Sequence, residues 1–316
     1  AEVGTAPLDN ENGRGKGVDS ALRSDLTAGM SKFHQQLHSV AMQSRGDVSI
    51  VIPTVNIAED DRQSVIGILE GALEDWTVVM SNTVEGELRK DSSGKRAPLE
   101  EIEFWRNRAA SLSPLYDQIM LPKVQQLMNV LEGSDNAQLS AFNYHFGELT
   151  KILLEAKDNV KFLTTLERHF KHIQEDSFHS IIDSMLSMVN GLRQVWVISR
   201  HFNTDDKMAP LMEAIAESLA KRVRDGVKLS TVLQMEFGEA RLLLRESKDV
   251  LSMWSENYFR MRKRIEDSGS DHRWEFDRKA LFGKTDYMNG VCNDILEVIE
   301  ALDHFRIFLG PELKQV

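Results

Sequence analysis

One stretch decides how this chain folds: Pro98-Leu99-Glu100-Glu101-Ile102-Glu103-Phe104-Trp105-Arg106-Asn107-Arg108-Ala109-Ala110-Ser111-Leu112-Ser113. A leading proline and glutamates in the first turn are typical of a helix start, because the helix dipole favours acidic groups there. At about 100° of rotation per residue, Phe104 projects away from the main apolar face, and Glu101 and Arg108 border that face. The face itself carries Leu99, Ile102, Trp105, Ala109 and Leu112. We therefore expect a core helix that packs between two neighbouring helices.

The composition indicates a helical protein with a sizeable core. Its 316 residues are enough for one elongated or two compact units. With 41% apolar residues, 28% charged residues and only seven prolines, bulk disorder is disfavoured. A net charge of -11 disfavours nucleic acid and anionic membranes as partners, because phosphate contacts need a basic face. We expect neither of these partners.

Features that the sequence lacks favour an intracellular protein. Cys292 is the only cysteine, and no Asn-x-Ser/Thr acceptor occurs, which indicates a reducing compartment. No apolar run approaches the roughly 20 residues that span a bilayer, and no signal peptide begins the chain. Because the chain starts at Ala1 without a methionine, we expect it to be a segment of a longer polypeptide.

The N-terminal part divides into a leader and a candidate docking region. Residues 1–18 show no hydrophobic period and are predicted to be a flexible leader. Residues 19–58 are predicted to begin with a helix from Asp19 to Gly46. Its apolar face carries Leu26, Met30, Phe33, Leu37 and Val40. This face is too short for a coiled coil, but it is suited to packing against a partner helix, so these residues are interaction candidates.

A β-branched run follows this helix as Val48-Ser49-Ile50-Val51-Ile52 and is stopped by Pro53. It is the one convincing strand candidate in the chain. A single strand leaves its backbone groups unpaired, so the segment either lies extended on helices or pairs with a strand of another chain. Both alternatives remain open, and Val48, Ile50 and Ile52 join the interaction candidates.

Hydrophobic periods predict helices throughout residues 59–316. The first runs from Asp60 to Lys90 and forms a hairpin with the helix that starts at Pro98. Ser113-Pro114 and Leu121-Pro122 are each predicted to reset the chain. Further apolar stripes cover residues 122–131, 139–170, 181–202, 208–223, 229–265 and 287–308. The predicted fold class is all-α, an elongated array of antiparallel helical hairpins and bundles with one short extended strand near the N-terminus.

Motifs that could carry enzyme chemistry are incomplete. Gly283-Lys284-Thr285 mimics the end of a phosphate-binding loop, but the upstream glycine and the preceding strand are missing. We predict a turn before the last helix there. Cys292 has no surrounding pattern that marks a nucleophile. We therefore expect no catalytic residue and no bound cofactor in this segment.

Histidine pairs and one basic cluster each have two interpretations. His34 and His38, like His169 and His172, lie about one helical turn apart, but zinc needs three or four ligands. We expect solvated or core-edge histidines and no metal. The basic run Arg260–Arg264 could bind an acidic partner, but basic residues at a helix C-terminus also complement the dipole, which is the interpretation we favour.

Two elements resemble the N-terminal tail of dynein heavy chains. The first is Pro-Leu-x-Glu-Ile-Glu-Phe-Trp-x-x-Arg-x-x-x-Leu, which begins at Pro98. The second is His272-Arg273-Trp274-Glu275-Phe276-Asp277-x-x-x-Leu281-Phe282. The resemblance covers residues 60–308 and, less specifically, 33–53. As structural positions we carry over Pro98, Leu99, Glu101, Ile102, Phe104, Trp105, Arg108, Leu112, Arg273, Trp274, Phe276 and Phe282.

The resemblance implies an assembly module and not the motor itself. Dynein tails associate with other dynein heavy chains, carry dynein intermediate and light chains, and in cilia anchor to a docking complex or the doublet microtubule. The ATP- and Mg-dependent AAA+ motor domains would lie further along the full-length chain. The implied location is the cytoplasm and cytoskeleton, in the axoneme of a cilium or flagellum. The motifs are closer to axonemal than to cytoplasmic heavy chains, with the outer arm as the subtype considered.

Two other function classes stay open at this stage. A non-motor intracellular scaffold of helical rods, such as a tethering-complex or spectrin-like subunit, would share the fold. An all-α enzyme with carboxylates on its helices is disfavoured by the missing ligand sets. Gly-x-x-x-x-Gly-Lys-Ser/Thr motifs further along the full-length reading frame would distinguish a motor from a scaffold.

Overall fold

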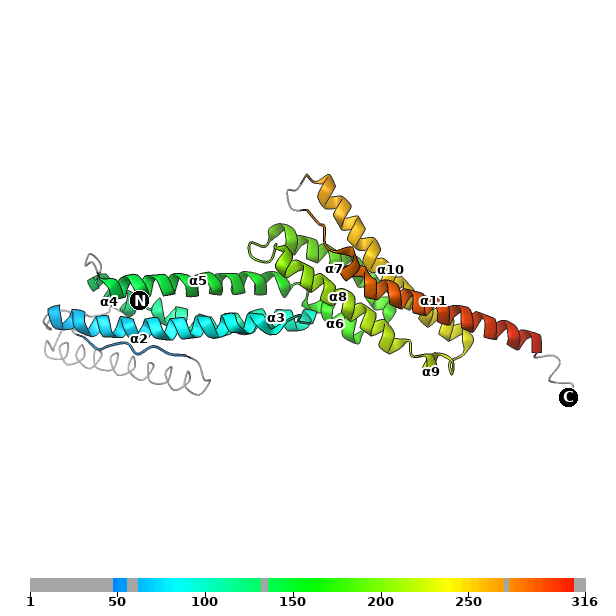
Figure 1. The fold of residues 1–316 in the computed structure, drawn as a ribbon, viewed down its shortest axis with the longest axis horizontal. Coiled ribbons are helices and arrows are strands. Elements are labelled where there is room, and N and C mark those ends of the chain that lie inside the picture. Colours follow the sequence, from blue (N-terminus) through cyan, green and yellow to red (C-terminus); the bar gives the residue numbers. More distant parts are fainter. Residues whose placement is uncertain (1–47, 56–61, 132–135, 270–272, 310–316) are drawn as a thin grey trace, which may run out of the picture. The chain divides into compact units, whose positions relative to one another are not determined.

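The fold is all-α. A computed structural model describes residues 48–55, 62–131, 136–269 and 273–309 (Figure 1). Its elements are α2 (Arg62–Arg89), the 3₁₀ helix η1 (Lys90–Ser93), α3 (Pro98–Ile119), α4 (Pro122–Leu131), α5 (Ala137–Leu163), α6 (Glu167–Glu175), α7 (Phe178–Ile198), α8 (Asp205–Gly226), α9 (Leu229–Val232), α10 (Phe237–Asp267) and α11 (Arg278–Leu309). The predicted all-α fold class is confirmed. None of these described helices is long and apolar enough to cross a membrane.

The chain divides into two compact units. The first unit comprises residues 1–79 and 114–139, and the second comprises residues 80–113 and 140–316. Helices α2 and α3 therefore each contribute residues to both units. The predicted division into 1–18, 19–58 and 59–316 follows the order of the chain and stays a prediction, since residues 1–47 lie outside the described part.

In the first unit, the predicted stripe of α2 faces the core. Val65, Leu69, Leu73 and Trp76 are 1–3% exposed and recur at helical spacing. Helix α4 adds the buried side chains Val124, Leu127, Met128 and Leu131. The helix that starts at Pro98 and the short helix up to residue 131 were both predicted from the sequence. Helices α3 and α4 confirm these predictions.

Pro114 does not end a helix, contrary to the prediction. Helix α3 continues through it to Ile119, and the chain resets only at Leu121-Pro122, where α4 begins. A proline inside a helix costs about 3 kcal/mol, because a hydrogen bond is lost and the ring crowds the preceding turn. Leu115 and Ile119 are both fully buried just beyond it. Burying each such side chain contributes roughly 1.5–3 kcal/mol, which offsets that cost.

In the second unit, α10 packs against α7, α8 and α11, and α11 also packs against α8 (Figure 1). Helix α6 packs on α7 and α8. Helices α10 and α11 run antiparallel, because Arg241 pairs with Asp303 at 2.8 Å while Asn289 Nδ2 donates to Ser252 Oγ at 3.3 Å. The largest fully buried side chains of this unit's core include Trp254, Trp274, Tyr258, Phe170 and Phe202.

Three predicted helix boundaries were wrong. The stripe over residues 139–170 is interrupted after α5 by a turn in which the Thr164 hydroxyl donates to the Val160 carbonyl at 2.7 Å. The stripe over residues 229–265 consists of the short helix α9 and the long helix α10. The last helix starts at Arg278 and not near residue 287, because Asp277 Oδ1 accepts the Lys279 amide at 2.9 Å. Gly283-Lys284-Thr285 therefore lies within α11 and is not a turn.

Candidate functional site

The first motif forms the start of α3 and one wall of the second unit's core. Five of its predicted positions are buried, namely Pro98, Ile102, Trp105, Arg108 and Leu112, and three are half-buried, namely Leu99, Glu101 and Phe104. Glu100 Oε2 accepts the Ala97 amide at 2.9 Å and so satisfies a backbone donor at the helix start. The sequence therefore predicted both the helix start and its buried face.

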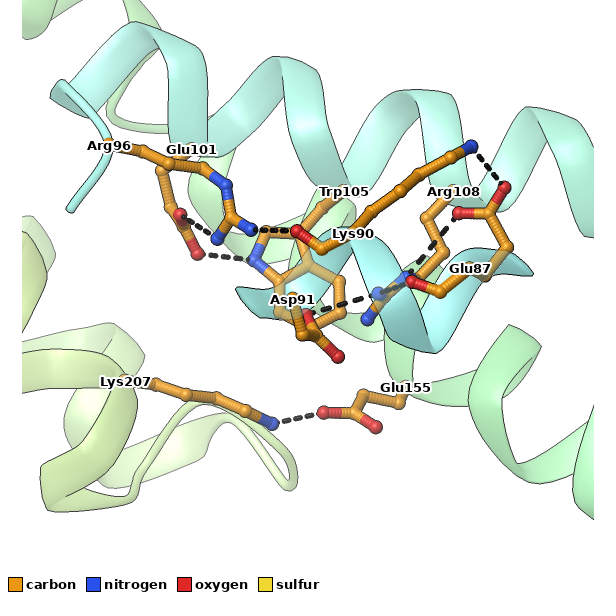
Figure 2. Close-up of polar contacts among 9 residues, drawn as sticks. All are labelled: Glu87, Lys90, Asp91, Arg96, Glu101, Trp105, Arg108, Glu155 and Lys207. Carbon is orange, nitrogen blue, oxygen red and sulfur yellow. Dashed lines mark hydrogen bonds and ion pairs between the residues drawn. The ribbon is translucent and has the colours of Figure 1, made fainter. Parts of the chain in front are cut away.

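Trp105 is fixed by a polar contact inside an apolar core. Its indole Nε1 donates to Glu101 Oε1 at 2.7 Å, and the side chain is only 4% exposed (Figure 2). Arg96 donates to the other Glu101 oxygen at 3.2 Å and to the Lys90 carbonyl at 3.1 Å. Glu101 thus joins the Trp105 ring to the loop that precedes α3.

Arg108 is buried, although the sequence placed it at the border of the apolar face. Its side chain is 2% exposed and lies against the end of α2 and η1 (Figure 2). The guanidinium donates to the Glu87 carbonyl at 2.6 Å, pairs with Asp91 at 3.0 Å, and lies 3.7 Å from the Glu87 carboxylate. Glu87 is also buried, at 4%, and accepts from Lys90 at 2.6 Å. A buried ion pair with such partners is costly to break from one side.

Phe104 was predicted to face a second helix. It packs against the core, and in addition the Arg96 guanidinium carbon lies 3.5 Å and that of Arg108 4.5 Å from its ring centroid. Guanidinium groups at such distances are attracted by the negative face of the ring. The second face of α3 is therefore a cation–π surface, which the pattern of apolar residues alone did not predict.

Lys207 and Glu155 complete the arrangement from α8 and α5. Lys207 pairs with the Glu155 carboxylate (Figure 2). It also donates to the His201 carbonyl at 2.7 Å and lies 5.4 Å from the Trp105 ring centroid. These residues are 52 positions apart in the sequence, and no local pattern linked them. Sequence reasoning therefore missed both.

A cavity of about 340 Å³ lies at this cluster and is lined by Arg96, Glu101, Trp105, Arg108, Glu155 and Lys207, among others. Each charged side chain drawn in Figure 2 has a partner of opposite charge within 4 Å. Charges neutralised in this way hold neighbouring helices in place. We name these six lining residues the Trp105 cluster, and its geometry is that of a structural junction.

The second motif builds an aromatic cluster in the same core. Trp274 and Phe276 pack with Trp196, at ring-centroid distances of 6.2 and 5.2 Å, and Phe282 packs with Tyr258 at 5.2 Å. The Phe276 amide donates to the Tyr258 hydroxyl at 3.2 Å, and burial raises the pKa of that hydroxyl. Arg273, the remaining motif position, is exposed. Both motifs therefore contribute to one hydrophobic core.

Cys292 is buried within this unit. Burial raises the pKa of its thiol to about 11, so the thiol stays protonated near neutral pH. Because the thiolate is the reactive form, Cys292 is a weak nucleophile in the folded chain.

Among the histidines, His172 pairs with Asp176. Hydrogen bonds from His172 and from Ser180 lower the pKa of the Asp176 carboxyl.

The interaction candidates of the N-terminal region divide into two sets. Leu26, Met30, Phe33, Leu37 and Val40 lie outside the described residues. Val48, Ile50 and Ile52 lie in a described segment, residues 48–55, which has no strand partner among the described residues. Ile50 is buried, Ile52 is half-buried, and Val48 is exposed. The segment thus lies against helices of the first unit, while the short strand and its pairing with another chain stay predictions.

Side chains of the first unit hold this extended segment. Gln118 Oε1 accepts the Ile50 amide at 2.9 Å, and Gln118 Nε2 donates to the Val48 carbonyl at 3.2 Å. Trp76 Nε1 donates to the Val51 carbonyl at 2.9 Å. The Val51 side chain, however, is 84% exposed. Helices α2 and α3 thus provide hydrogen bonds that a neighbouring strand would otherwise supply.

We expect Gln118→Ala to loosen residues 48–55 without unfolding the first unit. Losing its two hydrogen bonds to the segment should lower the free energy of local opening by about 1–2 kcal/mol. Hydrogen exchange followed by mass spectrometry measures this as faster exchange of a peptide that contains Ile50. Gln125→Ala, which lies on α4 and bonds the Ile119 carbonyl, is the control. Equal exchange in both variants would contradict the assigned role of Gln118.

Comparison with known proteins identifies the family. A sequence model of the dynein heavy chain, N-terminal region 1, matches residues 66–316. The chain belongs to this dynein heavy chain family. It is 43% identical over 298 residues to the dynein-1-alpha heavy chain of the flagellar inner arm I1 complex of Chlamydomonas reinhardtii, with 92% of this chain and 6% of that protein covered. It is 39% identical over 301 residues to human dynein axonemal heavy chain 10, with 93% and 7% covered.

The subtype can be compared as well. Identity to the flagellar outer arm beta chain of Chlamydomonas reinhardtii is 26%, with 96% of this chain and 7% of that protein covered. The sequence motifs led us to consider the outer arm, but this outer arm chain is less similar to the protein than the inner arm chain is. These dynein relatives are axonemal or flagellar by name, which agrees with the predicted cytoskeletal and axonemal location. The chain spans about 6–7% of their length.

Proposed function

We propose that this dynein segment is an assembly and anchoring module of an axonemal dynein. In this role it associates with other heavy chains and binds intermediate and light chains. It also helps to attach the dynein to a docking complex or to the doublet microtubule. ATP and Mg act in motor domains outside the segment. The family match over residues 66–316 carries the proposal, because the matched family is the N-terminal region of dynein heavy chains.

The chemistry of the motifs supports an architectural role. Arg108 and Glu101 form ion pairs with Glu87 and Arg96 within the second unit, and the motif aromatics are packed in its core. Groups that are buried and paired stabilise a scaffold and leave recognition to the surface. The non-motor scaffold that the sequence left open does not fit the family assignment.

The extended segment offers one route for association. Residues 48–55 are held by side chains and have no backbone–backbone ladder with other described residues, and Val51 projects outward. We propose that an added strand from another chain pairs with this segment by main-chain hydrogen bonds. The helix predicted before it, with Leu26 to Val40, would contribute apolar contacts to the same association.

Crosslinking mass spectrometry on the intact axonemal dynein complex tests the proposal. Expected products join residues 26–52 to another heavy chain or to a docking subunit, with Lys32 as the lysine available there. The proposed role in dimerisation or docking would be wrong if this region gave crosslinks only within its own chain. Binding of ATP with Mg to the 316-residue segment alone would contradict the assignment of these ligands to other domains.

A further inference from the structure

A groove runs along both sides of α8 in the second unit. One side, of about 670 Å³, lies between α8, α6 and residues 95–97. The other, of about 480 Å³, lies between α8 and α11. Glu217 and Lys221, one helical turn apart on α8, line both sides, so the two form one continuous surface. We name it the α8 groove.

The α8 groove is basic, although the chain carries a net charge of -11. Only two acidic side chains line it, Glu217 and Asp225, against six basic ones. The basic residues are Lys95, Arg96, Lys221, Arg222, Arg224 and Lys284. Lys95, Arg224 and Lys284 have side chains that are 53–63% exposed. A cluster of one sign of charge on a surface of the opposite sign attracts a complementary segment.

The Glu217 carboxylate in the groove already responds to this charge. The hydrogen bond from Lys284 to Glu217, at 2.8 Å, lowers the pKa of that carboxyl, and the positive charges of Lys95 and Arg224 lower it further. Lys221 is exposed and forms no ion pair with another described residue. Lys95, Arg96, Arg224 and Lys284 pair with Glu213, Glu101, Asp225 and Glu217, so among the described residues Lys221 and Arg222 carry the positive charge in excess.

An exposed tyrosine lies at the α11 side. Tyr287 lines the groove, and its side chain is 71% exposed. Large aromatic side chains that remain exposed beside apolar atoms are frequent anchors of protein interfaces. Here the apolar atoms come from Ala220 and Met288 on that side and from Ile173 and Ala214 on the other.

We propose that the α8 groove binds an acidic polypeptide segment of another subunit of the dynein complex. The inference rests on the assembly role proposed above and names the chemistry of one partner. The partner's carboxylates meet Lys221 and Arg224, and one of its apolar side chains packs against Tyr287. A polypeptide suits the groove better than a nucleic acid does, because Glu217 and Asp225 would repel an uninterrupted row of phosphates.

The test uses the intact complex with variants in the full-length heavy chain. In the wild type, a carbodiimide, which joins lysine to carboxylate directly, should crosslink Lys284 and Lys95 to aspartate or glutamate of another subunit. With Lys221→Glu and Arg224→Glu together, these crosslinks and retention of that subunit in a salt wash should fall at least tenfold. Tyr287→Ala should weaken retention in the same direction.

Matched variants control for general effects of charge and of exposed aromatics. Arg260→Glu with Lys263→Glu reverses two exposed basic residues of α10, and Tyr144→Ala removes a tyrosine that is 67% exposed on α5. Both should leave retention unchanged. A peptide that alternates glutamate with leucine should displace the subunit, whereas oligoadenylate of equal charge should not, and equal displacement by both would overturn the assignment to a polypeptide.

Two results separate this inference from the proposed function. If Lys95 and Lys284 crosslink only within their own chain while other residues of the segment reach a second subunit, the groove assignment is wrong and the assembly role stands. If no residue of the segment reaches another subunit, the assembly role itself fails. Equal loss of the subunit in the α10 control variant would also overturn the assignment to the α8 groove.

Discussion

Arg108→Met is expected to lower the free energy of unfolding of the second unit by about 3 kcal/mol, because it removes one of the two cationic partners of the buried Glu87 carboxylate. Glu87, at 4% exposure, would keep only the contact with Lys90, whose own side chain is 60% exposed. The Glu87 carbonyl would lose a donor at 2.6 Å, and Phe104 would lose one of its two guanidinium neighbours. Methionine fills a similar volume, so a cavity contributes little to the loss.

Guanidinium chloride unfolding followed by tryptophan fluorescence measures the effect. Arg106→Met is the matched control on the same helix, because Arg106 is 43% exposed and pairs with Glu103 and Glu167 at the surface. Exposed pairs contribute roughly 0–1 kcal/mol, so this variant should stay close to the wild type. Arg108→Met combined with Glu87→Gln should recover part of the loss, because the buried charge that has lost Arg108 is then absent. Equal midpoints for the Arg108 and Arg106 variants would contradict the assigned role.

The sequence predicted those parts of the fold that depend on local pattern. Helix α3 starts at Pro98 because proline and glutamate suit the first turn, and Ile102 and Trp105 face the core because their spacing puts them on one face. The early start of α11 also had a local signal in Asp277, a residue suited to capping a helix. The hydrophobic stripe over residues 287–308, in contrast, indicates a later start than this cap does.

The parts that were not predicted depend on contacts between distant residues. Helix propensity gives Pro114 a strong tendency to end α3, and only the burial of Leu115 and Ile119 reverses it. Arg108 looked like a border residue because its partners, Glu87 and Asp91, belong to the preceding hairpin element. A charged residue on an apolar face can be solvated or paired internally, and the sequence does not distinguish these outcomes.

The extended segment shows why a strand pattern leaves its partner open. Ile50 faces inward and Val51 outward, an alternation that is typical of an extended chain. Its backbone groups, however, bond to the side chains of Gln118 and Trp76, which lie on helices. Backbone N–H and C=O groups of an extended segment always need hydrogen-bond partners. Which groups become those partners depends on the fold and cannot be read from the local pattern.

Trp105→Ala is expected to lower the free energy of unfolding by about 3–5 kcal/mol, the range for removing a large aromatic side chain from a core. The ring is 4% exposed and belongs to the buried cluster that Ile102 also enters. The substitution also removes the hydrogen bond that the indole Nε1 donates to Glu101 at 2.7 Å. It removes the cation–π contact with Lys207, whose Nζ lies 5.4 Å from the ring centroid. Replacing Trp105 alone thus removes packing, polar and cation–π interactions together.

Two further variants separate these contributions. Trp105→Phe keeps an aromatic ring but removes the donor to Glu101, so it should cost about 1–3 kcal/mol, the range for an unmade buried hydrogen bond. Tyr144→Ala, at 67% exposure, should change stability by less than about 0.5 kcal/mol. Unfolding midpoints at equal protein concentration compare the three. A near-zero effect of Trp105→Ala would mean that the ring faces solvent or a partner, and the stretch that begins at Pro98 would then be a binding surface rather than a structural junction.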